Sequence, residues 1–323
     1  MNQIYQVREM IISYYKRYER IIFPILRFIA SFIIFLFISR MGYATVLTKL
    51  PVGILFGIIG TIIPAQWFFL LVIFLVSTHL AFVSIEAAVL VFLFLIIIYL
   101  LYIRMFPKQS LLMLALLLGF AFKIPFVVPL FAGLYVGVSS IVPIAFGTLI
   151  WYFIPHIQML INMKSGELLD IPNVLAKMYV STIQWVTKDQ TAIITIIIFS
   201  LVIIAVYCIS RFSFDYSWYV AIVIGAGINI IGFLVALLIV DMDINILGGL
   251  LSNIISMLLM FLVQFMHRVV DYSRAEKVQF EDEENYYYVK VIPKIILEKP
   301  KREIKRIVEE TPNIIEDPNG NQH

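Results

Sequence analysis

Residues 191–210, TAIITIIIFSLVIIAVYCIS, contain no charged side chain in twenty consecutive positions. A helix of about 20 apolar residues is long enough to cross the ~30 Å hydrocarbon core of a bilayer. The stretch also holds the one cysteine of the chain, Cys208. A single cysteine excludes an internal disulfide framework and a thiolate metal cluster.

The composition extends this conclusion to most of the 323 residues. Hydrophobic residues make up 62% of the chain and charged residues 14%, whereas soluble domains carry about 25% charged residues. We therefore predict an all-α polytopic membrane protein solvated by the lipid bilayer. The net charge is only +3, and no dense basic face marks a nucleic-acid partner.

Apolar runs predict about ten transmembrane helices, with eight as the main alternative. The middle segments, between residues 111 and 153, are short enough to form either three short helices or one span with re-entrant pieces. The ten predicted segments are 21–39, 50–63, 68–82, 87–103, 111–122, 125–138, 141–153, 191–210, 218–240 and 246–266.

Two polar regions flank or interrupt this transmembrane domain of residues 21–267. Residues 1–20 form a basic amphipathic pattern that suits a cytoplasmic helix in the headgroup layer. Residues 156–190 form a polar loop with an apolar helical stripe, which is typical of a surface helix. The excess of Lys and Arg in short loops on one side places both termini in the cytoplasm.

Glycine and proline break two of the apolar segments. Gly53, Gly57 and Gly60 form a small-residue stripe that favours close helix packing over a substrate path. Pro125 and Pro129 are four residues apart, so within one helix they would leave freed carbonyls on one face. These broken segments are candidate parts of a translocation site.

Isolated polar residues inside apolar runs are the other candidates. Glu86 and Lys123 are lone charges, for which either snorkelling at the interface or a role in translocation is expected. His79 is a candidate proton carrier or a buried structural histidine. Asn229 and Asn253, together with Gln264, suit hydrogen bonds between helices or contacts to a solute.

The sequence contains no catalytic motif: it has no phosphate-binding P-loop, no H-E-x-x-H zinc pair and no G-x-S-x-G elbow. Asp241 and Asp243 are too few to define a metal site. We therefore expect no enzyme activity, no cofactor and no metal ion.

Residues 268–297 follow the last span with VQFEDEENYYYVKVI at positions 278–292. Residues 276–281 alternate polar and apolar side chains, and residues 286–292 are rich in β-forming residues. Together they predict a cytoplasmic β-hairpin. A lone hairpin is marginal in water, so a partner protein or a second copy is expected to dock on it. The expected docking residues are Phe280, Tyr286, Tyr287 and Tyr288. Residues 298–323 read as a charged, largely disordered tail.

The tail carries a family resemblance through VDYSRAEKVQFEDEENYYYVKVIPKI, residues 270–295. The motifs Arg8-Glu-Met, Gly42-Tyr43, LTKLP at 47–51 and FKIP at 122–125 support it. The chain resembles an uncharacterised family of multi-pass membrane proteins from Firmicutes, often labelled permease-like. The resemblance implies a bacterial plasma membrane protein, and it implies no substrate, cofactor or site residue.

Two functions are compatible with these features. The first is a transporter-like or permease-like subunit without its own ATPase. The second is a membrane scaffold that does not transport and whose cytoplasmic hairpin docks a partner protein.

Overall fold

The first helix joins two segments that the sequence separates. The computed structural model describes residues 2–41, 43–162, 171–212, 216–239, 246–267, 276–281 and 286–291. Within it, α1 (Asn2–Ser39) is continuous through Pro24. A proline inside a membrane helix removes one donor but does not have to end the helix. The predicted boundary at residue 20 is therefore no break in secondary structure.

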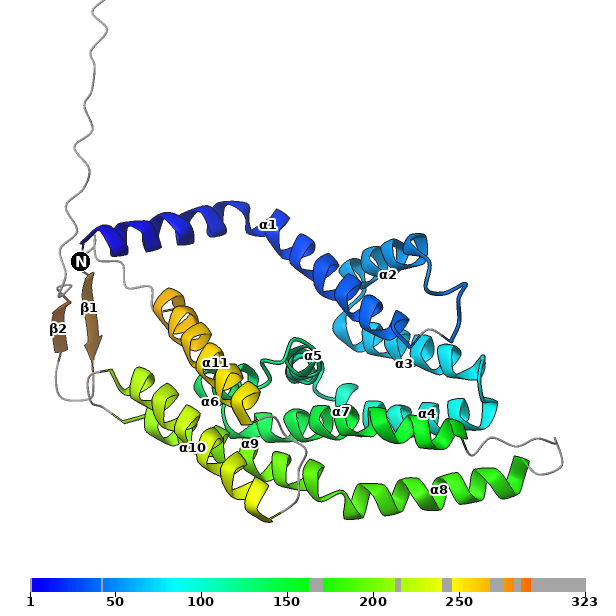
Figure 1. Ribbon diagram of the computed structural model, residues 1–323. Coiled ribbons are helices and arrows are strands. Elements are labelled where there is room, and N and C mark those ends of the chain that lie inside the picture. The colour runs from blue at the N-terminus through cyan, green and yellow to red at the C-terminus, as the bar shows by residue number, and fades with distance from the viewer. Residues whose placement is uncertain are drawn as a thin grey trace, which may run out of the picture. The chain divides into compact units, whose positions relative to one another are not determined.

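The other helices follow the predicted apolar segments in order along the chain (Figure 1). They are α2 (Leu50–Ile62), α3 (Ala65–Ala81), α4 (Ile85–Ile98) with its π-helical turn η1 (Tyr99–Ile103), α5 (Pro107–Ala121), α6 (Val127–Tyr135), the short 3₁₀ helix η2 (Val138–Ser140), α7 (Ile141–Asn162), α8 (Ile171–Lys188), α9 (Gln190–Ser210), α10 (Ser217–Ile239) and α11 (Ile246–His267).

Six helices in the described part of the chain are long and apolar enough to cross a membrane. They support an integral, multi-pass membrane protein, but the predicted count of ten crossings is not confirmed. The helix α2 has 13 residues and α6 has 9, so they extend only about 20 Å and 14 Å. The six candidates are Met10–Ser39, Ile85–Ile103, Val138–Asn162, Gln190–Ser210, Ser217–Leu238 and Ile246–His267.

The predicted polar loop 156–190 is largely helical. The helix α7 continues through Pro155 to Asn162, because Ile157, Leu160 and Ile161 bury an apolar face against α4 and α8. The helix α8 then carries the expected apolar stripe, of which Met178 is fully buried. The sequence-based end of the span at residue 153 was therefore wrong.

The helix α9 lies at the centre of one group of helices and packs against α6, α7 and α10 (Figure 1). Phe199, Val202 and Ile203 on α9 have no exposed surface. Close approach depends on Gly133 of α6, where a Cβ would meet Val206 Cβ at 2.9 Å. Burial among apolar side chains and small residues at crossings hold this group together.

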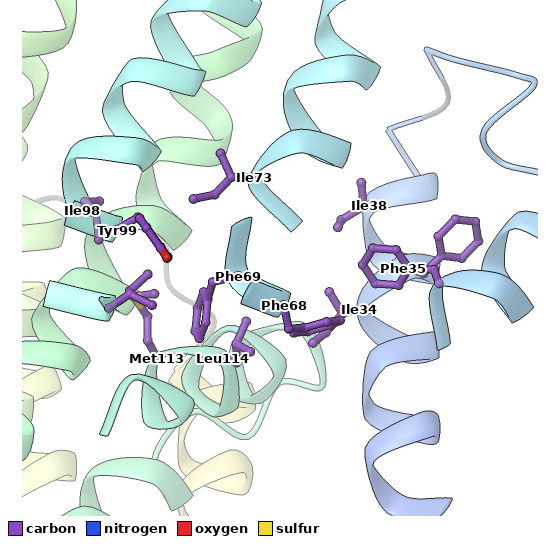
Figure 2. Close-up of a cluster of buried hydrophobic side chains, with 12 residues drawn as sticks. Ile34, Phe35, Ile38, Phe68, Phe69, Ile73, Ile98, Tyr99, Met113 and Leu114 are labelled. Atoms are coloured by element: carbon purple, nitrogen blue, oxygen red, sulfur yellow. The ribbon is translucent and has the colours of Figure 1, made fainter. Parts of the chain in front are cut away.

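A second group is built on α1, α2, α3, α4 and α5. Figure 2 shows Ile34 and Ile38 of α1 on one side of the view, Ile98 and Met113 on the other, and Phe69 between them. The helices α1 and α2 touch through the small-residue stripe. A Cβ at Gly53 would lie 2.6 Å from the Phe35 ring, and Gly57 and Gly60 are equally crowded by α1. The stripe is therefore a packing surface, as favoured from the sequence.

The strands β1 (Glu276–Glu281) and β2 (Tyr286–Val291) pair antiparallel. Phe280 is opposite Tyr287, while Tyr286 and Tyr288 are opposite Glu281 and Gln279. The hairpin belongs to a different structural unit from residues 8–268. The connecting residues 282–285, the tail 292–323 and the Asp241 and Asp243 turn lie outside the described residues.

Candidate functional site

Three of the predicted site residues meet in one cavity. Pro125, Asn229 and Asn253 line a space of about 190 Å³, which we call the asparagine pocket. Its walls come from the α5–α6 connection and from α5, α7, α9, α10 and α11. The other lining residues are Phe120, Phe126, Tyr152, Phe199, Ile230, Phe233, Leu234, Leu237, Ile246, Gly249 and Leu250.

Asn229 supplies the strongest polar feature of the pocket. Its side chain is 1% exposed, and neither Oδ1 nor Nδ2 has a hydrogen-bond partner among the described residues. A buried polar group without a partner costs about 1–3 kcal/mol. The amide can recover this free energy by binding a ligand or a water molecule in the pocket.

Only one of the two polar atoms of the Asn253 side chain has a hydrogen-bond partner among the described residues. Its Nδ2 donates to the backbone oxygen of Ala226 at 2.8 Å, while Oδ1 has no partner in the described part of the chain. Ala226 is three residues before Asn229, so both lie on the same face of α10. This bond therefore brings the free Oδ1 of Asn253 to the side of the pocket that Asn229 occupies.

Tyr152 of α7 adds a third polar group. Its hydroxyl lies 3.2 Å from Thr195 Oγ1 on α9. Thr195 already donates its hydroxyl proton to the Thr191 oxygen at 2.8 Å, so Tyr152 is the donor of the pair. The Tyr152 oxygen keeps its capacity to accept a hydrogen bond from a ligand.

Gly249 leaves room where α11 borders the pocket. A Cβ built there would meet no described atom within 4 Å. The nearby lining residues Leu234 and Ile246 are 43% and 51% exposed, so the pocket opens to the surface on this side. Gly249 is therefore a lining position with room for an added side chain.

The two prolines do not act as the sequence suggested. Pro125 precedes α6, and Pro129 lies in the first turn of α6, where backbone N–H groups have no helical acceptor in any case. The Pro125 carbonyl accepts from the Val128 N–H at 3.2 Å. The predicted set of freed carbonyls on one helix face was wrong. Pro125 lines the pocket, whereas Pro129 is buried outside its lining.

Lys123 lies outside the pocket lining and is exposed. It ends α5 with a left-handed φ of 61°. The Ile124 N–H donates to the Gly119 oxygen at 2.7 Å and the Lys123 N–H to the Phe120 oxygen at 3.0 Å. These two bonds make a Schellman motif with lysine at the position that glycine usually occupies.

Glu86 and His79 also lie away from the pocket, on either side of the turn between α3 and α4. Ser84 caps α4 by accepting from the Ala87 N–H at 3.1 Å, and its hydroxyl donates to Glu86 Oε2 at 2.8 Å. A carboxylate in the first helical turn suits the helix dipole. His79 is fully buried with neither ring nitrogen bonded among the described residues.

Sequence reasoning missed Tyr152, Thr195 and the open space at Gly249. It also passed over Arg27, whose guanidinium donates to the Ile63 oxygen at the end of α2, at 2.6 Å. Gln264 is separate from the pocket and accepts from the Tyr135 hydroxyl at 2.7 Å. A hydroxyl in an apolar run is a weak signal, because threonine and tyrosine are common in membrane helices without a functional role.

Among the described residues, the lining of the pocket offers hydrogen-bond donors and acceptors but no charged side chain. The described residues also contain no group of three or more His, Cys, Asp or Glu side chains that could hold a metal ion. The aromatic walls of the pocket, with Phe126 edge-on to Phe233 at 5.4 Å between ring centres, suit a small uncharged solute.

In comparisons with known proteins, no family model matches the chain, and neither a curated protein nor a solved structure matches it.

Proposed function

We propose that this chain is a transporter-like, permease-like membrane protein that binds a small uncharged polar solute in the asparagine pocket. The observation that carries the proposal is a set of three polar atoms without a partner among the described residues, two on Asn229 and one on Asn253, beside a cavity in a membrane domain. Such atoms are costly in an apolar interior unless a ligand or water pairs with them.

The depth of the pocket supports the same proposal. Asn229 lies twelve residues from the start and ten from the end of α10, which corresponds to about 18 Å and 15 Å along the helix. Transporter sites commonly lie near the bilayer midplane, where helices from different parts of the chain meet. Because the sequence has no P-loop, an ion gradient or a separate ATPase would supply the energy.

The proposal also covers the membrane in which the protein lies and the protein family to which it belongs. The protein would lie in a bacterial plasma membrane with both termini in the cytoplasm, as the basic loops favour. It would belong with the permease-like Firmicutes proteins that its tail resembles.

Cysteine accessibility tests whether the pocket is open to an aqueous solute. In a Cys208→Ser background, Asn229→Cys and Asn253→Cys are exposed to a charged, membrane-impermeant methanethiosulfonate reagent in sealed vesicles. The matched control is Ile231→Cys, which lies two residues away on α10 with a side chain that is 64% exposed. Because that side chain faces lipid at nearly the same depth, it should stay unlabelled.

We expect both pocket cysteines to react from one side of the membrane and the control to resist. If neither pocket cysteine reacts from either side, the pocket is not a solute path and the proposal fails.

A second pair of variants separates transport from the scaffold alternative. Gly249→Phe adds a ring at a position that lines the pocket, whereas Gly227→Phe adds the same ring at another open position of the described residues that does not line it. Each variant is expressed in a strain that lacks the gene. Failure of Gly249→Phe to restore the normal phenotype, while Gly227→Phe restores it, supports transport. Failure of the chain without residues 276–295, while Gly249→Phe restores the phenotype, would support the scaffold instead.

A further inference from the structure

A second, larger cavity lies in the group of helices built on α1 to α5. It has a volume of about 250 Å³ and shares no lining residue with the asparagine pocket. Its walls come from α1, α3, α4 with η1, α5 and α7. Figure 2 shows several of its lining side chains, among them Ile38, Phe69, Ile73 and Met113. We call this space the acyl cavity.

The lining of the acyl cavity excludes water as a stable occupant. Every described residue that lines it has an aliphatic, thioether or aromatic side chain, and the indole N–H of Trp151 is the single side-chain hydrogen-bond donor among them. A buried water needs two to four polar partners, and apolar cavities stay dry. The volume corresponds to about eight water molecules at ~30 Å³ each, so leaving it empty would forfeit many dispersion contacts.

Hydrocarbon is the available occupant, because the protein lies in a bilayer. The lining residue Ile154 is 43% exposed, so the cavity reaches the surface of α7. A lipid chain can enter there without crossing an aqueous layer.

Two cations lie at one end of the acyl cavity. Phe37 lines the cavity, and the guanidinium carbon of Arg40 is 5.0 Å from the centre of its ring. The Phe37 ring is also in edge contact with Phe122, at 5.7 Å. Lys123 follows Phe122 directly and is exposed. Arg40 therefore contacts one ring of this aromatic pair, and Lys123 is the exposed residue next to the other ring in the sequence.

We propose that the acyl cavity binds one hydrocarbon chain of an anionic phospholipid, whose phosphate lies against Arg40 and Lys123. The apolar lining selects the chain, and the charge complementarity selects an anionic headgroup over a zwitterionic one. This site is independent of the asparagine pocket and of any transport through it.

The positions of the two cations also have a simpler explanation. Both follow the last turn of a helix, where a positive charge complements the helix dipole. The helix-dipole explanation predicts no preference among lipids. Comparing two lipids that have identical chains and different headgroups therefore distinguishes it from the lipid-binding proposal.

The test measures lipid affinity of the full chain purified in detergent. Dioleoylphosphatidylglycerol and dioleoylphosphatidylcholine are titrated separately, and the rise in melting temperature gives an apparent Kd for each. Two Lys/Arg side chains near an anionic headgroup correspond to a roughly thirtyfold preference for phosphatidylglycerol. We expect Arg40→Gln/Lys123→Gln to bring that ratio close to one.

A matched charge control is Arg104→Gln/Lys108→Gln, in which two exposed cations after η1 are neutralised. It should keep the preference of the unmodified protein. Equal affinity for the two lipids in the unmodified protein would overturn the proposal. An equal loss of preference in the control pair would overturn it as well, because the effect would then be one of overall charge.

A second pair tests the chain-binding part. Val91→Phe fills the acyl cavity, and Val89→Phe adds the same ring on the lipid-exposed side of α4. We expect Val91→Phe to weaken the affinity for both lipids at least tenfold and Val89→Phe to leave both affinities unchanged. Unchanged affinity in Val91→Phe would place the chain elsewhere. If Val91→Phe gives no cooperative melting, the smaller change Ala121→Leu, at another lining residue, takes its place with the same expected outcomes.

Discussion

The side-chain amide of Asn253 donates to the backbone oxygen of Ala226, 2.8 Å away, one helical turn before Asn229. This bond ties α11 to α10 and leaves Asn229, on the same face of α10, without a partner among the described residues. The two asparagines therefore have different tasks. Asn253 contributes to holding the helices together, whereas the amide of Asn229 is available to a ligand.

Asn253→Leu removes the hydrogen bond from Asn253 to the Ala226 oxygen of α10. Hydrogen bonds between membrane helices contribute about 0.6 to 1.7 kcal/mol, and Ala226 would keep its bond within the helix. Leucine also removes the unpartnered Oδ1 of Asn253, which offsets part of this loss. We therefore expect the free energy of unfolding to fall by less than this amount, measured by denaturant titration in a fixed detergent.

Asn229→Leu should change stability in the opposite direction. Replacing a buried amide that lacks a partner by an apolar side chain of similar size removes a penalty of about 1–3 kcal/mol. We expect an unfolding free energy that is unchanged or raised by roughly 1 kcal/mol, together with loss of the solute-dependent phenotype. A loss of stability equal to that of Asn253→Leu would show that Asn229 is engaged in a structural bond.

Lys123→Gly should stabilise the protein. A left-handed φ costs a side-chain-bearing residue about 1–2 kcal/mol, and glycine avoids this cost at the end of α5. We expect a gain of about 1 kcal/mol in unfolding free energy, measured as above. Lys108→Gly, in the first turn of the same helix, is the control and should lose up to about 1 kcal/mol. Equal effects would refute the helix-end role of Lys123.

Gly60→Ala should separate α1 from α2. The added Cβ would lie 2.6 Å from Ser31 Cβ and 2.7 Å from the Phe68 ring, and overpacking of this kind costs about 1–3 kcal/mol. Gly227→Ala adds the same methyl group where no described atom lies within 4 Å and should be neutral or slightly stabilising. The difference in melting temperature between the two variants measures the tightness of the α1–α2 contact.

Local pattern predicts the helices well but places their ends less well. Apolar runs mark each helical segment because lipid leaves no alternative to intrahelical hydrogen bonds. The helix α1 crosses the predicted boundary at residue 20 and continues through Pro24, and α7 continues through Pro155 beyond the predicted end at residue 153. A proline removes one donor, but neighbouring turns and packing carry the helix through it. The number of crossings depends on helix length and depth, and short helices such as α2 and α6 satisfy the apolar pattern without spanning the core.

The candidate site was predictable in part. Asn229 and Asn253 stand out as amides within apolar runs, but their meeting at one pocket depends on the packing of α10 on α11. Lys123 and Glu86 stand out by charge, and each lies at a helix end outside the pocket lining. Tyr152 and Thr195 carry no local signal, because a hydroxyl becomes part of a site only through the helix that lies opposite it.

Gly249 gives a means of sizing the unknown ligand. Gly249 lines the pocket of about 190 Å³, and no described atom lies within 4 Å of a Cβ built there. Alanine, valine and leucine at this position therefore form a series of increasing side-chain volume at the wall of the pocket. The step of this series at which binding is lost would bracket the volume of the solute, so its size can be measured before its chemistry is known.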